Sequence, residues 1–280
     1  MGHEKSDINS GKEISEHGSE HQIGTLPESQ FNSISQVIAV MSGKGGVGKS
    51  SVAAITAVKL LKEGYQVGLL DADITGPSIP KMFGIETSAE ATGLGILPVK
   101  SKLGIKIMSL NLLLDNEDDP VIWRGPLIAG AVRQFWTDVV WRKLDYLIVD
   151  LPPGTGDVPI TVMQSLPLDG VIIVSSPQDV AVMIVKKAIR MASMMDIKVL
   201  GLIENMSYAV CPNCGEILRL FGPSIGERLA ESSGIPYLGS LPIDPELAKA
   251  CDLGLIEKYD NEIMQSSIKW AEIINKGDKK

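Results

Sequence analysis

Residues 43–50 of this chain, Gly-Lys-Gly-Gly-Val-Gly-Lys-Ser, limit what it can fold into more than any other stretch. They fit the phosphate-binding loop pattern G-x-x-x-x-G-K-[ST], in which backbone N–H groups surround a polyphosphate. Four of these eight positions are glycine, so no Cβ atom blocks the approach of an anion. The apolar run Val37–Met41 precedes the loop, and a helical pattern, Val52–Leu61, follows it. Because a phosphate loop lies between a strand and a helix, we predict a nucleotide site here.

The side chains of the loop have separate roles. The pattern assigns Lys49 to the β- and γ-phosphates and the hydroxyl of Ser50 to Mg²⁺. Lys44 is a second lysine that an ordinary phosphate loop does not need. It is either a solvated surface charge or a contact to phosphate from a neighbouring subunit. The predicted nucleotide-binding residues of this segment are Gly43, Lys44, Gly45, Gly46, Val47, Gly48, Lys49, Ser50 and Ser51.

Composition argues against several classes of function. With 280 residues, 44% of them hydrophobic, the chain can form one large domain with a well-buried core. It has no run of about 18 apolar residues and a net charge of −8, so we expect neither a membrane partner nor sequence-independent binding of nucleic acid. Three cysteines and no signal-peptide pattern favour a reducing, cytoplasmic setting. All three histidines lie in the first 21 residues, which excludes a Ser–His–Asp site in the body.

The chain divides into an acidic tail, residues 1–33, and one domain, residues 34–280. The tail has six acidic residues, two lysines and few large apolar groups, so we expect it to be disordered. In the domain, apolar runs alternate with helical patterns, which predicts a single-domain α/β fold with a doubly wound, mostly parallel sheet. The predicted strands are Val37–Met41, Val67–Leu70, Ile105–Leu110, Tyr146–Val149, Val171–Ser175, Val199–Ile203 and Tyr237–Leu241. The predicted helices are Ser50–Glu63, Leu127–Val140, Val180–Met194, Ile225–Ser232 and Glu262–Ile274.

Acidic residues follow two of the predicted strands. Asp71 and Asp73 come directly after Val67–Leu70, and Asp150 follows another apolar run. Ligands of a doubly wound sheet bind outside the carboxyl ends of its strands, which places these acids beside the phosphate loop. A carboxylate there can hold Mg²⁺ directly or through water, so Asp71 and Asp150 are candidate magnesium residues. The alternative is a set of solvated acids that cap strand ends.

Two cysteines, Cys211 and Cys214, form a C-x-x-C loop. This spacing suits one metal centre, because thiolates select zinc, copper(I) or an iron–sulfur cluster. A Cys₄ centre needs four thiolates and one chain offers two adjacent ones, so we predict a centre shared across a two-fold homodimer. A structural zinc, a redox dithiol and chance are the alternatives. Cys251, in an apparent helix, is predicted to be a small core residue.

Six motifs occur in order along the chain: KGGVGKS, DADITGPSIP, the Trp123–Pro126 turn, DLPPGTGD, ENMS and CPNC. Residues 36 to about 260 therefore resemble the Mrp/ApbC-type iron–sulfur cluster carrier ATPases, members of the MinD/ParA-like class of P-loop proteins with a deviant Walker A motif. The resemblance implies a P-loop NTPase fold that binds ATP and Mg²⁺. It also implies a homodimer that holds a labile [4Fe–4S] cluster between its subunits and transfers it to apo-proteins.

The same resemblance assigns roles to individual residues. It implies that Lys44 acts across a nucleotide-sandwich dimer and that Lys49 is catalytic beside it. Asp73, in the first switch, positions or activates the hydrolytic water. Asp150 becomes the Walker B acid at the start of the second switch. Asn205 is implied to recognise adenine.

Two departures from the family accompany this resemblance. The N-terminal cysteine cluster of eukaryotic cytosolic relatives and the small N-terminal domain of many bacterial members have no counterpart in this sequence. Two rival functions remain open at this point. One is a MinD/ParA-like positioning ATPase, which has no use for Cys211 and Cys214. The other is an ATPase scaffold stabilised by an interfacial zinc.

Overall fold

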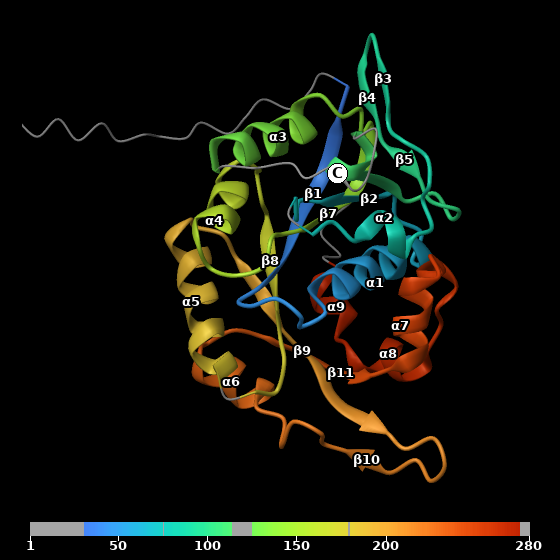
Figure 1. Cartoon of the computed structure of the whole chain (residues 1–280). Coiled ribbons are helices and arrows are strands. Elements are labelled where there is room, and N and C mark those ends of the chain that lie inside the picture. Colours follow the sequence, from blue (N-terminus) through green and yellow to red (C-terminus); the bar gives the residue numbers. More distant parts are fainter. Residues whose placement is uncertain (1–30, 75, 114–124, 179, 275–280) are drawn as a thin grey trace, which may run out of the picture.

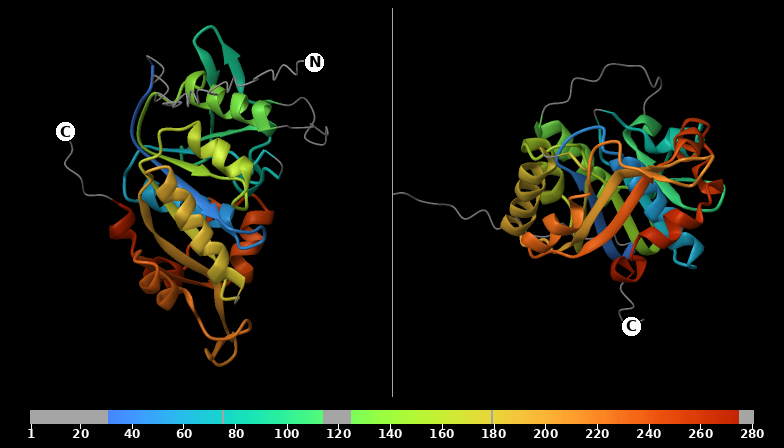
Figure 2. Two further views of the ribbon diagram at one scale, coloured as in Figure 1. Left: turned by 90° about the vertical axis from the view of Figure 1, so that its left-hand side faces the viewer. Right: turned by 90° about the horizontal axis from the view of Figure 1, so that it is seen from below.

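The structure, a computed structural model, describes residues 31–74, 76–113, 125–178 and 180–274. Figure 1 shows a central sheet with helices on both faces, and the view from below in Figure 2 shows the same three layers. The strands are β1 Ser33–Ser42, β2 Val67–Asp71, β3 Glu90–Thr92, β4 Gly95–Leu97, β5 Val99–Lys100, β6 Lys106–Ser109, β7 Lys143–Asp150, β8 Gly170–Ser175, β9 Val199–Val210, β10 Ile217–Leu218 and β11 Tyr237–Ile243. The α-helices are α1 Lys49–Lys62, α2 Ile79–Met82, α3 Gly125–Thr137, α4 Asp157–Gln164, α5 Val180–Met194, α6 Gly226–Ser232, α7 Pro245–Asp252, α8 Glu262–Ser267 and α9 Trp270–Ile273.

The strand order of the main sheet is that of a doubly wound fold. Across the sheet the order is β10-β9-β8-β1-β7-β2-β6-β5, and β11 pairs with β9. Strand β1 is parallel to β7 and β8, and β2 is parallel to β6 and β7. Only the short strands β5 and β10 run antiparallel to their neighbours in this sheet, among the described residues. The predicted α/β fold with a mostly parallel sheet is therefore confirmed.

The register of the strands brings three strand ends together. Val40 of β1 lies opposite Asp150 of β7, and Asp71 at the end of β2 lies opposite the same Asp150. The loop after β1 and the acidic segments after β2 and β7 thus leave the sheet at one edge. That edge is where doubly wound sheets bind their ligands.

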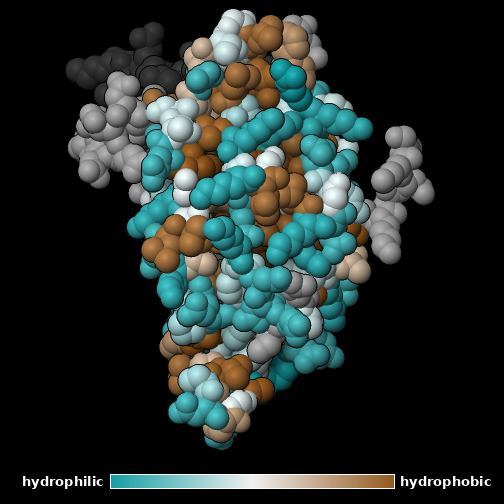
Figure 3. All heavy atoms as spheres, turned by 90° about the vertical axis from the view of Figure 1, so that its right-hand side faces the viewer, coloured by the Kyte–Doolittle hydropathy of each residue, from teal (hydrophilic) through white to brown (hydrophobic). Residues whose placement is uncertain are grey.

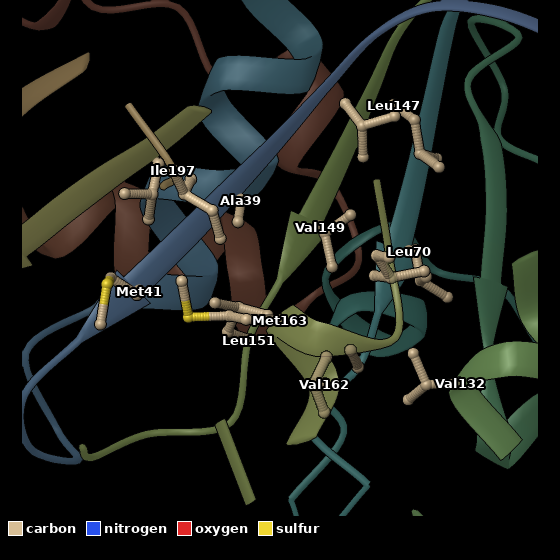
Figure 4. Packing of buried hydrophobic residues seen from close by; sticks show 14 of the residues in the cluster. Ala39, Met41, Leu70, Val132, Leu147, Val149, Leu151, Val162, Met163 and Ile197 are labelled. Atoms are coloured by element: carbon tan, nitrogen blue, oxygen red, sulfur yellow. The ribbon is translucent and has the colours of Figure 1, made fainter. Parts of the chain in front are cut away.

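Strand β1 is buried on both faces because its alternate side chains enter two hydrophobic clusters. Ala39 and Met41 pack in a cluster that helices α3, α4, α5 and α6 cover, whereas Ile38 and Val40 pack under α1, α2, α7 and α9. Figure 4 shows the first cluster, in which side chains of β1 and β7 meet those of α3 and α4. A strand with this double burial needs an apolar run rather than an alternating pattern, which is what the sequence has.

Two predicted elements differ from the structure. Strand β9 was expected to end at Ile203 but continues to Val210, because its later residues pair with β10 and β11. The helix expected over 262–274 is two short helices, α8 and α9. Between them Ile268 forms a β-bridge with Gly239 of β11, which takes that part of the backbone out of the helix.

Some predictions fall on residues that the structure leaves out. Most of the predicted acidic tail lies outside the described residues, as do Trp123 and Arg124 of the predicted turn. Ser33, expected to end the tail, is the first residue of β1 and pairs with Lys143. In the described ranges, none of the helices has the length and apolar character that crossing a bilayer requires.

Candidate functional site

The phosphate loop joins the end of β1 to the first turn of α1. Gly46 and Gly48 both have a φ of 77°, in the left-handed region where a Cβ atom would strain the backbone. A Cβ atom on Gly43 would lie 1.6 Å from a methyl carbon of Ile184, so helix α5 packs directly against the start of the loop. Three of the loop glycines are therefore required by conformation or by close packing.

The loop forms one wall of a cavity of about 230 Å³ at the carboxyl ends of the strands. This cavity brings the loop together with the segments after β2 and β7. Val47 faces the hydrophobic core instead and is 2% exposed. The lining residues are Ser42, Gly45, Gly46, Gly48, Lys49, Ser50, Ser51, Asp73, Ser78, Met82 and Pro153.

Lys49 is the cation at the centre of the site. Its Nζ atom lies 2.5 Å from Oδ1 of Asp150 and 4.0 Å from Oδ2 of Asp73. It is also 3.4 Å from the hydroxyl of Ser50. Lys49 and Asp150 are 6% and 0% exposed, so this ion pair is shielded from water. The structure thus gathers three of the other predicted site residues, Ser50, Asp73 and Asp150, around the ammonium group of Lys49.

Asp71 shapes the segment that follows β2. Its Oδ2 atom accepts hydrogen bonds from the backbone N–H groups of Ser78 and Ile79, at 2.9 and 3.0 Å. Its Oδ1 atom accepts one from the N–H of Asp73 at 3.2 Å. Burial, together with the negative charge of Asp150 beside it, raises the pKa of Asp71 to about 8. The segment that follows β2 is therefore tied to the end of that strand through Asp71.

The site has the donor set for a magnesium ion. Burial raises the pKa of Asp150, and the charge of Lys49 opposes that shift. The second carboxylate oxygen of Asp150, Oδ2, is buried and has no hydrogen-bond partner among the described residues. A buried oxygen of this kind needs a partner, and Mg²⁺ prefers carboxylate and hydroxyl oxygens. Asp150 and the Ser50 hydroxyl therefore fit a Mg²⁺ ion that the loop's phosphate ligand would share.

Lys44 and Asn205 both make contacts that the sequence did not predict. The Nζ atom of Lys44 donates a hydrogen bond to Oε1 of Gln178, in the segment after β8. The side-chain amide of Asn205, 5% exposed in β9, donates to the backbone carbonyl of Val47 at 2.9 Å. The roles predicted for these two residues, in a dimer and towards adenine, remain predictions.

The cysteine pair lies at the turn between β9 and β10. Cys211 N–H donates to the carbonyl of Glu216, and Gly215 N–H donates to the carbonyl of Cys211, both at 2.9 Å. Figure 1 shows this hairpin extending below the body of the molecule. Cys211 is half-buried and Cys214 is exposed. Among the described residues no three His, Cys, Asp or Glu side chains gather as metal ligands.

Apolar side chains surround the cysteines on this hairpin. In Figure 3, hydrophobic atoms gather at the lower end of the molecule, where the hairpin lies. Five of these side chains are between 37% and 62% exposed. They are Val210, Ile217, Leu218, Leu220 and Phe221, and together with Cys211 and Cys214 we call them the hairpin surface.

We expect two of the thiols, those of Cys211 and Cys251, to react in an order set by their surroundings. Hydrogen bonds from the N–H groups of Asn213 and Cys214 lower the pKa of Cys211, whereas burial raises the pKa of Cys251. At a pH below the ordinary pKa of a thiol, a larger fraction of Cys211 than of Cys251 is therefore thiolate. Iodoacetamide reacts with the thiolate, so it should label Cys211 at a lower pH than Cys251. Peptide-resolved mass spectrometry between pH 6 and 9 measures this. Unfolded protein is the control, because its thiols should lose the difference. Faster labelling of Cys251 at pH 7 would contradict the expectation.

Some residues of the site were missed by the sequence prediction. Gln178 follows β8, which lies beside β1 in the sheet. A polar residue at the end of a strand next to the phosphate loop could therefore have predicted its contact with Lys44. Ser78 and Met82 line the cavity only because Asp71 folds their segment back towards the loop. Glu204, buried beside Asn205, stands in the ENMS motif, but the sequence assigned it no role.

A phosphate loop with buried acids at the carboxyl edge of a doubly wound sheet defines a P-loop NTPase. Solved structures agree on the fold. The MinD protein of Pyrococcus horikoshii, complexed with Mg-ADP, matches with a TM-score of 0.60 and 21% identity, covering 87% of this chain and 97% of that one. A nucleotide-binding protein of Archaeoglobus fulgidus, in complex with ADP, matches with a TM-score of 0.75 and 47% identity, covering 83% and 91%.

The family model described as NUBPL iron-transfer P-loop NTPase, of the ParA type, matches residues 33–276, and this chain belongs to that family. An iron–sulfur cluster carrier protein of Clostridium perfringens is 48% identical over 237 residues, 82% of this chain and 83% of that protein. One of Methanocaldococcus jannaschii is 50% identical over 227 residues, 80% and 78% of the two chains. The cytosolic Fe-S cluster assembly factor CFD1 of Saccharomyces cerevisiae is 45% identical over 238 residues, 82% and 81%. The family resemblance of the motifs is thereby confirmed.

Proposed function

We propose that this protein is an ATP-hydrolysing carrier of an iron–sulfur cluster. Two subunits hold one labile [4Fe–4S] cluster as cargo, through Cys211 and Cys214 of each, and pass it to apo-proteins. The observation that carries the proposal is the combination, in one chain of an iron-transfer family, of a complete phosphate loop and an exposed two-thiol hairpin. A [4Fe–4S] cluster takes four thiolate ligands and each subunit offers two, so two subunits are needed to bind one cluster.

The nucleotide half of the function follows from the cavity. The loop amides and Lys49 bind the phosphates of ATP, and Lys49 exchanges part of its contact with Asp150 for phosphate oxygens. Ser50 and Asp150 hold Mg²⁺, which supplies charge neutralisation at the phosphates when bound. Asp73 lines the cavity 4.0 Å from the ammonium of Lys49 and orients the attacking water. Asn205 recognises adenine through its amide oxygen, an acceptor for the amino group of the base.

Hydrolysis depends on the second subunit through Lys44. In the single chain Lys44 donates to Gln178, so its ammonium group already lies near the loop. In the dimer it leaves Gln178 and contacts the phosphates bound by the partner, where its charge offsets negative charge in the transition state. This arrangement makes ATP turnover a property of the dimer.

The cargo half of the function follows from the hairpin surface. Its apolar side chains are exposed in the single chain. A second copy of the same surface would cover them and would also supply the two further thiolates that the cluster needs. A two-fold contact would place each hairpin against the other and bring Cys211 and Cys214 of both subunits to the axis. Burying apolar area around the thiols also keeps water away from the cargo.

Anaerobic reconstitution with iron and sulfide tests the proposal. We expect about four irons and four sulfides per dimer, together with slow MgATP hydrolysis. One zinc per dimer and no cluster would favour an interfacial structural zinc instead. ATP turnover without any metal bound at the cysteines, and sedimentation with DNA or liposomes, would favour a positioning ATPase.

A further inference from the structure

Strand β9 contains an irregular segment between the phosphate loop and the cysteines. Its pairing with β11 runs from Ser240↔Glu204 to Pro242↔Tyr208, so four steps along β9 match two steps along β11. The extra residues form a bulge, and Met206 within it has a φ of 57°, in the left-handed region that strains a non-glycine residue. The pairing of β9 with β8 also stops at Glu204. The regular pairing of β9 is thus interrupted at this bulge, which consists of Asn205, Met206 and Ser207, and it resumes at Tyr208.

One end of the bulge touches the phosphate loop. The side-chain amide of Asn205 donates to the Val47 carbonyl at 2.9 Å. A Cβ atom on Gly48 would lie 2.2 Å from that same amide nitrogen and 3.7 Å from the terminal methyl carbon of Met206. The loop backbone at Val47–Gly48 therefore has the bulge as its direct neighbour, so a shift of the loop there would disturb the contact with Asn205.

The other end of the bulge is tied to the chain that returns from the hairpin. The Ser207 hydroxyl donates to Oε2 of Glu204, a carboxylate that is 0% exposed. Oε1 of the same residue accepts from the backbone N–H groups of Ile225 and Gly226, at 3.0 and 2.7 Å. Both ends of the segment that carries the cysteines are thus held at one buried carboxylate.

We propose that this bulge couples the nucleotide site to the cysteine hairpin, with Asn205 as the positioning residue that links them. Cys211 lies six positions after Asn205, about 20 Å of extended strand, so a rotation at the bulge reaches the hairpin along one continuous piece of backbone. When phosphates draw the loop N–H groups inward, the Val47 carbonyl shifts and Asn205 follows it. The strained Met206 gives the bulge a second conformation within reach. This inference rests on the proposed function, since it supplies the regulation of the cluster by nucleotide.

The coupling is measurable without any cluster. Iodoacetamide labelling of Cys211 and Cys214 in the apo-protein, resolved by peptide, reports the conformation of the hairpin. It is compared with and without saturating MgADP, at a protein concentration where sedimentation gives the same mass in both conditions. We expect MgADP to change the labelling rate of these cysteines by about fivefold, the lower end of allosteric coupling. In Asn205→Ala the change should fall below about twofold, although the variant is saturated with MgADP.

The matched control is Asn32→Ala. Asn32 also donates its side-chain amide to a carbonyl, that of Val139 at 2.8 Å, and belongs to neither the loop nor β9. It should keep the full response. If Asn205→Ala cannot be saturated, Ser207→Ala replaces it, because that change loosens the bulge and leaves the loop contact intact. No response in the wild type, a full response in the bulge variants, or an equal loss in Asn32→Ala would each overturn the inference. A wild type that responds but binds no cluster would contradict the proposed function alone.

Discussion

Replacing Lys49 with methionine is expected to lower kcat/KM for ATP hydrolysis by at least about 100-fold, the loss typical of removing one charged donor from a reacting oxyanion. The ammonium group of Lys49 is the buried cation of the cavity, within 2.5 Å of Asp150. Methionine keeps most of the chain length and removes the charge, so the phosphates lose their ammonium contact. A steady-state phosphate-release assay under saturating Mg²⁺ measures the effect.

The same variant should also be less stable, by about 3 to 5 kcal/mol, because Asp150 is left as a buried carboxylate without its cation. Lys49→Met/Asp150→Asn removes both charges and should recover part of this free energy of unfolding while remaining inactive. Urea unfolding of the two variants separates loss of chemistry from loss of fold. A Lys49→Met protein that hydrolyses ATP within a factor of ten of the wild type would remove Lys49 from the mechanism.

Replacing Cys211 and Cys214 together with serine is expected to abolish cluster binding. Reconstituted iron and sulfide should fall from about four of each per dimer to background, because serine offers no thiolate for iron. Nucleotide affinity should stay within about twofold, since neither cysteine lines the nucleotide cavity. Iron counting and MgADP titration on the same preparation measure both effects.

Cys251→Ser is the matched control for the double variant. Cys251 lies in α7 with its sulfur 4.0 Å from the hydroxyl of Ser51, beside the phosphate loop rather than on the hairpin. Its replacement should leave the iron content unchanged. A full complement of iron and sulfide in the double variant would mean that the cluster is held elsewhere.

The phosphate loop and its acids were predictable because each is a local pattern at a strand end. Gly46 and Gly48 adopt the left-handed conformations that their identity favours, and Asp150 follows an apolar run as predicted. The pairing of Lys49 with Asp150 was not predictable from local sequence. It depends on residues that are about a hundred positions apart, brought together by the order of β1 and β7 in the sheet.

The course of β9 was the largest error in the strand prediction. The predicted strand ends at Ile203, and three of the next four residues, Glu204, Asn205 and Ser207, are polar. In the structure Glu204 and Asn205 are buried, because each finds a backbone partner on another element. Buried polar residues with tertiary partners look like loop residues in sequence, since their hydrogen bonds are long-range. The hairpin was therefore recognised from its cysteines alone.

The attachment of the cysteine hairpin has a consequence for engineering this fold. Strand β10 is held by two residue pairs with β9. The segment that carries the hairpin leaves the body at Glu204 and rejoins it at Ile225, whose N–H donates to the Glu204 carboxylate at 3.0 Å. A segment with such neighbouring ends can be exchanged as a cassette without rebuilding the sheet. Turns that present other metal-binding side chains could be transplanted there while the phosphate loop stays untouched.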